Sequence, residues 1–309
     1  MSNPPDVSPV RDYFMQLQDE ICDCLEVLDA KQTFLKRELP GPEGGVARPR
    51  VLESKGNIEK TAVQFTHSIG ASLPPAATAR NPQLAGQRFQ AVAISLIVHP
   101  LNPYVPTTHM NLRFFLVEAE EPVWYFGGGF DLTPYYGFEA DAVHWHRTAA
   151  AACEPFGEDI YPALKQACDE YFYLDHRKEA RGIGGIFFDD WVRGGFEESF
   201  RFVRSVGDHF LPAYRPLFER RQNTPWSERE RDFQLYRRGR YAEFNLAIDR
   251  GTQYGLQSGR RVESVLASLP PLVQWRYDYH PPEGTPEAEL YKTFLPPRDW
   301  LTVPGRKKL

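Results

Sequence analysis

The chain has 309 residues, of which 42% are hydrophobic and 25% charged, as is typical of a folded globular protein. Its net charge of −5 argues against a general nucleic-acid-binding protein, since such proteins usually carry a basic excess. No apolar run reaches the roughly 18 residues of a membrane-spanning helix, and the N-terminus lacks the apolar stretch of a signal peptide. Because the four cysteines form no CxxC pair, we expect a cytoplasmic protein with reduced thiols.

The first half of the chain is predicted to be one helix followed by strands. Apolar residues recur at helical spacing from Val10 to Leu28, and residues 39–49 then form a loop rich in proline and glycine. Strands are predicted where apolar residues alternate with polar ones or run together, over residues 50–54, 58–70, 89–100 and 108–119. Residues 123–126 form a further short strand that runs into a loop at Gly127–Gly129.

The second half is predicted to be mainly helical. Segments with helical spacing of apolar residues cover 140–157, 161–182, 196–221, 227–239, 260–271 and 286–295. Ser227 and Glu230 fit a capping box at the start of one of these helices. The remaining segments are predicted to be a buried strand, a hairpin that turns at Asp249–Gly251 and a late strand, over residues 185–191, 240–259 and 272–280.

These elements together predict the α+β class. Strands cluster early and late with helices between them, and regular βαβ alternation is missing. The sequence contains no internal repeat and no linker long enough to separate two domains. We therefore expect residues 1–309 to form a single domain with a large, mainly antiparallel sheet covered by helices.

One predicted strand, "THMNLRFFLVEA" at residues 108–119, carries an unusual polar row. Side chains two apart on a strand share a face, so His109, Asn111 and Arg113 lie side by side opposite an apolar row. An ordinary solvated strand face would favour Thr, Lys or Glu. An arginine alone is more often part of a surface ion pair, but the three together favour a functional site.

Neighbouring segments extend this polar surface. Ser95 and His99 share one face of the preceding strand, and Asp131 follows the three glycines. Glycine triplets also form plain turns, but a carboxylate beside glycines and near arginines is able to stay ionised and act as a base. The pattern predicts a site floor made from a sheet, with residues 126–137, "FGGGFDLTPYYG", as a mobile rim or lid.

Arginines form three clusters in this acidic chain. Arg177 and Arg181 are four apart on a predicted helix, and the other clusters are Arg237, Arg238 and Arg240, and Arg260 and Arg261. Arginine binds carboxylates through two parallel hydrogen bonds, so the clusters fit a small polycarboxylate ligand better than nucleic acid. For Arg237 and Arg238, surface ion pairs with Glu228 or Glu230 are the alternative.

Histidines raise the alternative of a metal site. His144 and His146 are two apart on a predicted helix, where they point about 200° away from each other. A site built from His99, His109, His146 and His176 is conceivable, but the four lack the spacing of known metal motifs. The spacing alone therefore gives an obligate metal little support.

Five long blocks in a fixed order resemble one family. They read "VHPLNPYVPTTHMNLRFF", "WYFGGGFDLTPYYGFEADAVHWHRT", "YFYLDHRKEARGIGGIFFDDW", "QLYRRGRYAEFNLAIDRGTQYGLQSG" and "RVESVLASLPP". The chain resembles oxygen-dependent coproporphyrinogen III oxidase, the aerobic haem-pathway enzyme, from about Arg50 to "RDWL" near its end, and residues 1–49 match more loosely. The resemblance implies a large antiparallel sheet sandwiched between helices, and a homodimer with residues 241–276 as the dimerisation region.

The same resemblance implies a reaction. Propionates on rings A and B of coproporphyrinogen III undergo oxidative decarboxylation to vinyl groups, which gives protoporphyrinogen IX. O₂ is consumed as co-substrate, CO₂ and hydrogen peroxide are released, and no organic cofactor takes part. The sequence leaves a divalent metal open, and no nucleic acid or membrane partner is expected.

Site roles are implied residue by residue. His109 corresponds to a proton donor, Asp131 to a carboxylate that engages the pyrrole N–H groups, and Arg181 to a propionate anchor. The residues expected to carry the catalysis are His109, Asp131 and Arg113. The implied substrate-binding positions are Ser95, Asn111, Leu112, Arg113, Gly259, Arg260 and Arg261, and the implied metal ligands are His99, His109, His146 and His176. One departure is that Arg260 replaces the second glycine found in many relatives.

Two other functions compete with this one. A metal-dependent oxygenase would use the histidines as ligands and would lose activity when metal is stripped. A non-enzymatic carrier of tetrapyrroles or other polycarboxylates would bind its ligand tightly without consuming O₂.

Overall fold

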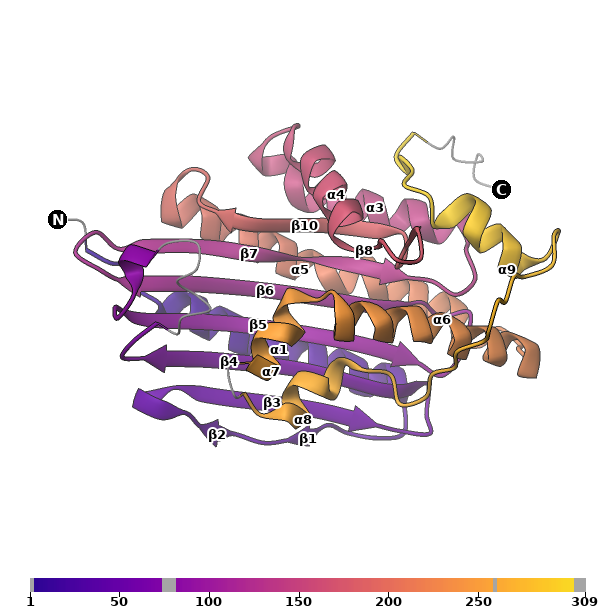
Figure 1. Ribbon diagram of the computed structural model, residues 1–309, viewed down its shortest axis with the longest axis horizontal. Helices are drawn as coiled ribbons and strands as arrows, with labels where there is room; N and C mark the ends of the chain where they lie inside the picture. The colour runs from indigo at the N-terminus through magenta and orange to yellow at the C-terminus, as the bar shows by residue number, and fades with distance from the viewer. Residues whose placement is uncertain (1–2, 74–81, 258–259, 303–309) are drawn as a thin grey trace.

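A sheet of eight strands forms the centre of the computed structural model, which describes residues 3–73, 82–257 and 260–302 (Figure 1). All its pairings are antiparallel, in the order β1-β3-β4-β5-β6-β7-β10, and β2 also pairs with β3. The strands are β1 (Leu35–Lys36), β2 (Leu39–Pro40), β3 (Val46–Glu53), β4 (Ile58–Gly70), β5 (Arg88–Pro100), β6 (Thr107–Glu118), β7 (Val123–Thr133) and β10 (Gly184–Trp191). A separate two-stranded hairpin pairs β8 (Tyr173–Leu174) with β9 (Glu179–Ala180).

Helices cover both faces of the sheet. They are α1 (Ser8–Asp29), α3 (Glu139–Cys153), α4 (Ile160–Tyr171), α5 (Gly195–Arg221), α6 (Glu228–Ala247), α7 (Arg250–Gln257), α8 (Val262–Val265) and α9 (Pro286–Glu289). Figure 1 shows α6, α7 and α8 on the face toward the viewer, which we call the front face, and α1 and α5 on the back face. The predicted α+β fold with a helix-covered antiparallel sheet is therefore confirmed. Among the helices of the described residues, none has the length and apolarity needed to cross a membrane.

The hydrophobic core lies on the back face. Leu112 and Phe114 of β6 are almost fully buried there, together with Phe14 and Ile21 of α1 and Phe210 of α5. Burial of such side chains contributes roughly 1.5–3 kcal/mol each, so this face supplies most of the stability. The predicted capping box also forms, because Glu230 accepts a hydrogen bond from the Ser227 backbone N–H at 2.8 Å.

Two predicted elements between residues 161 and 259 are wrong. The helix expected to reach residue 182 ends at Tyr171, and the chain then turns into the β8–β9 hairpin through Lys178, which has a φ of 56°. The hairpin expected over 240–259 is replaced by helix wherever α6 and α7 run, because α6 continues to Ala247 and α7 covers Arg250–Gln257, and residues 258–259 lie outside the described part of the chain. Asp249 then accepts a hydrogen bond from the Thr252 N–H at 2.7 Å, so it starts α7 instead of making a hairpin turn.

The late strand expected over residues 272–280 is also wrong. This segment is irregular, and it pairs with no strand in the part of the chain that the structure describes. Its Trp275 donates an indole N–H to Glu243 of α6 at 2.8 Å, and Tyr277 is fully exposed. The alternation of apolar and polar residues therefore does not correspond to a buried and a solvated face, because Leu272, Trp275 and Tyr277 are all exposed.

The predicted glycine loop at residues 127–129 is a buried part of β7. Gly129 pairs with both neighbours, Asn111 of β6 and Phe187 of β10, so these glycines are neither a rim nor a lid. Neighbouring chains come too close for side chains, since a Cβ at Gly129 would lie 1.9 Å from the carbonyl oxygen of Ile186. The sequence pattern misled because glycine serves close approach in a strand as well as turns.

Gly129→Ala is therefore expected to destabilise the protein by roughly 2–4 kcal/mol, from steric overlap and from the φ of +136° together. Gly86 provides a matched control, because its φ is +78° but a Cβ at that position would meet nothing within 4 Å. Gly86→Ala should cost only about 1 kcal/mol, from backbone strain alone. Urea unfolding of both variants measures the difference, and equal losses would contradict the close approach of β7 and β10.

Candidate active site

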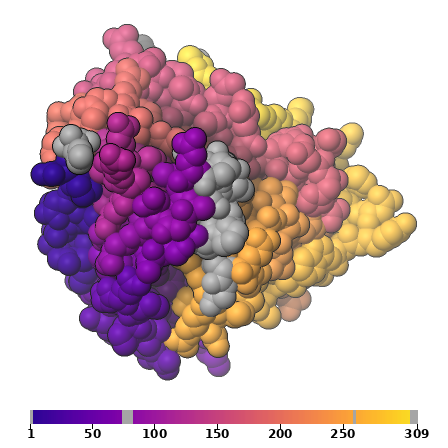
Figure 2. All heavy atoms as spheres, turned by 60° about the vertical axis from the view of Figure 1, so that its left-hand side comes forward, coloured from indigo at the N-terminus to yellow at the C-terminus, as the bar shows by residue number. Residues whose placement is uncertain are grey.

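The polar row lies in the middle of the front face. Ser95 of β5 pairs with Asn111 of β6, and His109 of β6 pairs with Asp131 of β7. Directly paired residues share a face, so the predicted sheet floor with polar groups on adjacent strands is present. The side chains of Ser95, His109 and Asn111 are partly exposed, whereas the alternate residues of β5 and β6 are buried. Figure 2 shows the orange segment with α7 and α8 beside the purple strands of this face.

A buried ion pair supports His109 from below. The Nδ1–H of His109 donates to Oδ1 of Asp131 at 2.9 Å, and Nη2 of Arg181 donates to both Asp131 oxygens at 2.8 and 2.7 Å. The Asp131 side chain is 2% exposed and that of Arg181 1%, but His109 is 24% exposed. Of these three groups, only the imidazole reaches the open face, and its Nε2 is the atom left for a ligand.

Aromatic rings enclose the guanidinium of Arg181. Its Cζ lies 4.1 Å from the ring centroid of Phe172, 4.7 Å from that of Tyr241 and 4.6 Å from that of Phe244. Such cation–π contacts stabilise a desolvated cation, so the cage compensates part of the cost of burying Arg181. In this position Arg181 holds Asp131 and does not face the sheet floor. The propionate-anchoring role implied by resemblance stays a prediction.

Electrostatics keep Asp131 ionised. Burial alone would raise the pKa of this carboxyl group, but the neighbouring Arg181 and the hydrogen bond from His109 outweigh it and lower the pKa. An ionised carboxylate only accepts hydrogen bonds, which fixes the proton of neutral His109 on Nδ1. The arrangement therefore orients the imidazole of His109.

Arg113 crosses β7 to reach the edge strand. Its Nη1 donates to Oδ1 of Asn111 at 2.8 Å, and its Nη2 donates to Oδ1 of Asp189 on β10 at 2.8 Å. A Cβ at Gly127, the residue paired with Arg113, would lie 2.6 Å from that guanidinium. The first glycine of the triplet is therefore needed so that Arg113 can lie flat across the sheet.

Two residues of this network, Asp189 and Arg250, were not predicted from the sequence. Arg250, the first residue of α7, donates from Nη2 to Oδ2 of Asp189 at 3.1 Å and lies 5.0 Å from the ring centroid of Tyr171. The available signals were an acidic pair at the end of a buried strand, "FFDDW", and an arginine next to Asp249, which starts a helix. Neither signal identifies a partner that is 61 residues away.

The other implied substrate residues are placed differently. Leu112 is buried on the back face, so only its backbone is available on the sheet floor. Arg260 and Arg261 are exposed before α8; the Arg260 guanidinium lies 5.4 Å from the ring centroid of Tyr254, and Arg261 pairs with Glu263 at 3.1 Å. Gly259 lies outside the described residues, and the substrate-binding roles of all four positions stay predictions.

The four histidines of the implied metal site are not brought together. His99 lies on β5 and His146 on α3, both are fully buried, and both ring nitrogens of each are within 3.3 Å of a hydroxyl or carbonyl oxygen. Burial lowers the pKa of both, that of His146 to about 3. Within the described residues, no three His, Cys, Asp or Glu side chains are arranged to hold a metal ion. These residues do not fit a four-histidine metal centre.

His176 and Arg177 lie on the turn of the β8–β9 hairpin and not on a helix. Both donate to Oε2 of Glu243 at 2.9 Å, so they tie the hairpin to α6 and are not directed to the sheet floor. Burial alone would raise the pKa of Glu243, but the bonds from Arg177, His176 and Trp275 outweigh it and lower the pKa to about 2.

Acid is therefore expected to loosen the hairpin. The folded-state pKa of Glu243 is lower than the ordinary value of about 4.3, so its stabilisation is complete above that pH and is lost as the pH falls toward 2. Hydrogen exchange of residues 173–180 at pH 6 and pH 3 measures this, with lower protection factors expected at pH 3. In Glu243→Gln the hairpin should be weakly protected at both values, and equal protection in the unmodified protein would contradict the prediction.

Arg237 and Arg238 are not in surface pairs with Glu228 or Glu230, so that alternative is wrong. Both side chains are buried, and they form ion pairs with other carboxylates: Arg237 with Glu179 at 2.6 Å and Arg238 with Glu59 at 2.7 Å. They join α6 to the β8–β9 hairpin and to β4. This cluster is structural and does not contribute to the floor.

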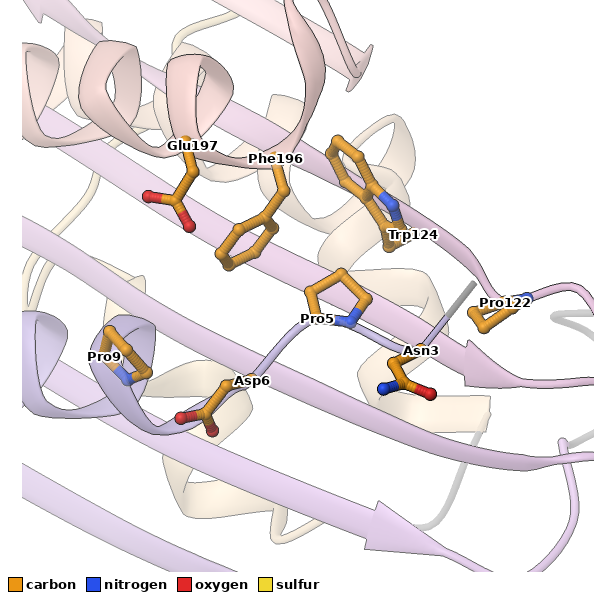
Figure 3. A pocket seen from close by; sticks show the side chains of 8 residues that line it. All are labelled: Asn3, Pro5, Asp6, Pro9, Pro122, Trp124, Phe196 and Glu197. Carbon is orange, nitrogen blue, oxygen red and sulfur yellow. The ribbon is translucent and has the colours of Figure 1, made fainter. Parts of the chain in front are cut away.

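Two hollows lie apart from this constellation. One of about 320 Å³ near the N-terminus is lined by prolines, Trp124 and Phe196 (Figure 3). The other, of about 700 Å³, lies between the β8–β9 hairpin, α6 and the C-terminal segment. No residue of the polar row lines either hollow. We therefore assign the candidate active site to the open part of the front face.

A comparison with protein families identifies the family of the chain. The family model described as coproporphyrinogen III oxidase matches residues 9–300. That span contains the helix-covered sheet, the His109–Asp131–Arg181 group and the arginines of the floor. It also includes α1, whose sequence resembled the family only loosely. The chain belongs to the coproporphyrinogen III oxidase family, whose enzymes are oxidoreductases of haem biosynthesis.

Proposed function

We propose that this chain catalyses the oxygen-dependent form of the family's reaction. Two propionates of coproporphyrinogen III, on rings A and B, are converted to vinyl groups, and the product is protoporphyrinogen IX. The observation that carries this proposal is the partly exposed His109 on an arginine-bearing floor, held by the buried pair of Asp131 and Arg181.

The balance of the reaction requires a proton donor. Each propionate loses CO₂ and, formally, a hydride from its β-carbon, and O₂ takes up the hydride. One further proton converts the resulting hydroperoxide anion to hydrogen peroxide. His109 is suited to supply that proton, since its Nδ1–H is held by an ionised carboxylate and its side chain is partly exposed.

Asp131 acts in this proposal as a positioning residue. Its two oxygens are occupied by Arg181 and His109, and its side chain is almost fully buried. Contact with pyrrole N–H groups, which the resemblance implies, would require these bonds to open. We infer instead that Asp131 holds the imidazole of His109 in its orientation, as a buried carboxylate does in other acid–base sites.

The polar residues of the sheet floor are suited to bind the carboxylates of the substrate. Arg113 and Arg250 carry fixed positive charges that are 31% and 49% exposed, and the Asn111 amide lies next to Arg113. Arginine remains charged at any working pH and binds carboxylates with defined geometry. Four propionates on a flexible macrocycle give the substrate several groups for these residues to orient.

Cysteine placement supports O₂ as oxidant over a reaction run by a cysteine-bound iron–sulfur cluster. Cys22, Cys153 and Cys168 are buried in three different helices, and burial raises the pKa of each thiol, which disfavours the thiolate that binds metal. The proposal therefore includes O₂ as co-substrate.

The proposal also includes a homodimer formed through residues 241–276. Large apolar side chains are exposed along this segment: Leu246, Leu256, Val262, Leu272 and Trp275. Apolar groups gathered in one region of a surface mark a protein interface more often than scattered ones do. Sedimentation equilibrium tests this part, and a monomer at micromolar concentration would contradict it.

The test of function is O₂ uptake with coproporphyrinogen III by protein treated with a chelator, together with fluorescence of the oxidised product. Vinyl product and O₂ consumption without added metal support the proposal. Activity that returns only with one particular metal would favour a metal-dependent oxygenase. Tight binding without O₂ consumption would favour a carrier, and turnover that needs no O₂ would overturn the oxygen-dependent assignment.

A further inference from the structure

One carboxylate on the edge strand bridges two arginines that come from different elements. Oδ1 of Asp189 accepts from Arg113 of β6 at 2.8 Å, and Oδ2 accepts from Arg250 of α7 at 3.1 Å. Each oxygen therefore meets one guanidinium, which is how a bound carboxylate is held between two arginines. Asp189 occupies the place that an incoming carboxylate would be expected to take.

The backbone around Asp189 is specifically shaped for this contact. Asp189 follows Phe187 on the front face of β10, and the register shifts between Phe188 and Trp191. Asp190 has a φ of 49°, a region that non-glycine residues seldom adopt. Such bulges end pairing and redirect a side chain, and they are frequent beside active sites.

The guanidinium of Arg113, which contacts Asp189 from β6, is also held in place by its neighbours. The guanidinium of Arg113 occupies the space beside Gly127 on the intervening strand, where a Cβ would meet it at 2.6 Å and force it to shift. The Asn111 amide oxygen accepts from the other nitrogen of Arg113 at 2.8 Å and fixes its orientation. Arg113 is thus held in place by contacts that do not involve Asp189.

The ion pairs of Asp189 are more exposed to solvent than the buried pair of Asp131 and Arg181. The side chains of Asp189, Arg113 and Arg250 are 27%, 31% and 49% exposed, whereas Asp131 and Arg181 are sealed from solvent. Partly exposed ion pairs contribute little net stability and break readily. Burial alone would raise the pKa of Asp189, but Arg113 and Arg250 outweigh it and lower the pKa, so the group is an anion. If displaced, this anion turns to water at little cost.

We propose that Asp189 is an exchangeable counter-ion of the substrate site. In the free protein it neutralises and aligns Arg113 and Arg250, and a substrate carboxylate then replaces it between the two guanidinium groups. Asp189 is a positioning residue, and it also competes with the ligand. Exchange of one carboxylate for another leaves the net charge of the arginine pair unchanged and couples binding to α7, which carries Arg250. This inference rests on the proposed function, since it takes a carboxylate-bearing substrate as given.

Asp189→Asn is the direct test, because it keeps the shape and removes the competing charge. The dissociation constant of coproporphyrin III, the oxidised and unreactive form of the substrate, is expected to fall about fivefold, as is the KM for coproporphyrinogen III. Glu219→Gln is the matched control. It removes one negative charge from an exposed pair with Arg215 on α5, on the back face, and should change neither constant.

Unchanged or weaker binding by Asp189→Asn, with a normal far-ultraviolet spectrum, would overturn the exchange. If the variant does not fold, a crystal structure of the unmodified protein with coproporphyrin III decides. Asp189 is expected beyond hydrogen-bonding distance of Arg113 and Arg250, and both bonds intact in the complex would overturn the proposal. Failure of the proposed function looks different, because it is seen in the unmodified protein, as missing O₂ uptake or missing vinyl product, and not in the difference between that protein and Asp189→Asn.

Discussion

Replacement of His109 by glutamine is expected to reduce turnover of coproporphyrinogen III by about 10²–10⁴-fold, with little change in KM. A positioned general acid typically contributes a factor of this size. Glutamine still offers an amide N–H to Asp131, so the buried pair beneath keeps most of its partners, but no proton with a suitable pKa remains. Steady-state O₂ uptake across substrate concentrations separates the two parameters.

His144→Gln is the control for a general effect of losing a histidine. His144 lies on α3 and bonds through Nε2 to the carbonyl oxygen of Pro212 on α5, away from the front face. Its turnover should equal that of the unmodified protein. A His109→Gln variant within threefold of normal turnover would remove His109 from the role of proton donor.

The sequence predicted the floor of this site better than its surroundings. A strand repeats every two residues, so the shared face of His109, Asn111 and Arg113 follows from spacing alone. The alternation on the preceding strand likewise places Ser95 next to Asn111 once the two strands pair. The two-residue repeat of a strand and the polarity of its side chains depend only on neighbouring residues, so both can be read from a single sequence.

The glycine triplet shows where local reasoning fails. Gly127 and Gly129 indicate a turn, because turns are the commonest reason for consecutive glycines. Their actual reasons are the guanidinium of Arg113 on one neighbouring strand and the carbonyl of Ile186 on the other. Those groups come from segments that no local pattern connects to residue 127 or 129. The same limit explains why the lid was placed on what is a buried strand.

The remaining wrong predictions concern residues whose contacts lie far away in the sequence. Arg181 was assigned to a helix face with Arg177, but three aromatic rings and Asp131, 50 residues away, hold it inside the protein. The helix-prone sequence forms a hairpin here, since tertiary contacts routinely override local propensity. Asp189 was missed for a related reason, since its two arginines come from β6 and α7.

The buried pair makes the largest prediction for stability. Asp131→Asn leaves the charge of Arg181 without its counter-ion inside the aromatic cage, and Arg181→Met leaves the carboxylate of Asp131 buried with only His109. Removal of one partner of a buried ion pair typically destabilises a protein by about 3–5 kcal/mol. Each single variant is therefore expected to lower the free energy of unfolding by that amount.

The double variant, which combines Asp131→Asn with Arg181→Met, tests whether the cost comes from the unpaired charge. No isolated charge remains in it, and the new methionine side chain packs well against Phe172, Tyr241 and Phe244. We expect it to be more stable than either single variant, by at least about 2 kcal/mol in guanidinium unfolding. Additive losses would show that Asp131 and Arg181 stabilise the fold through other neighbours.

If the pair is coupled and the double variant folds, its turnover separates the stabilising role of Asp131 from its role in positioning His109. Activity should stay low, because His109 then lacks the carboxylate that orients its imidazole.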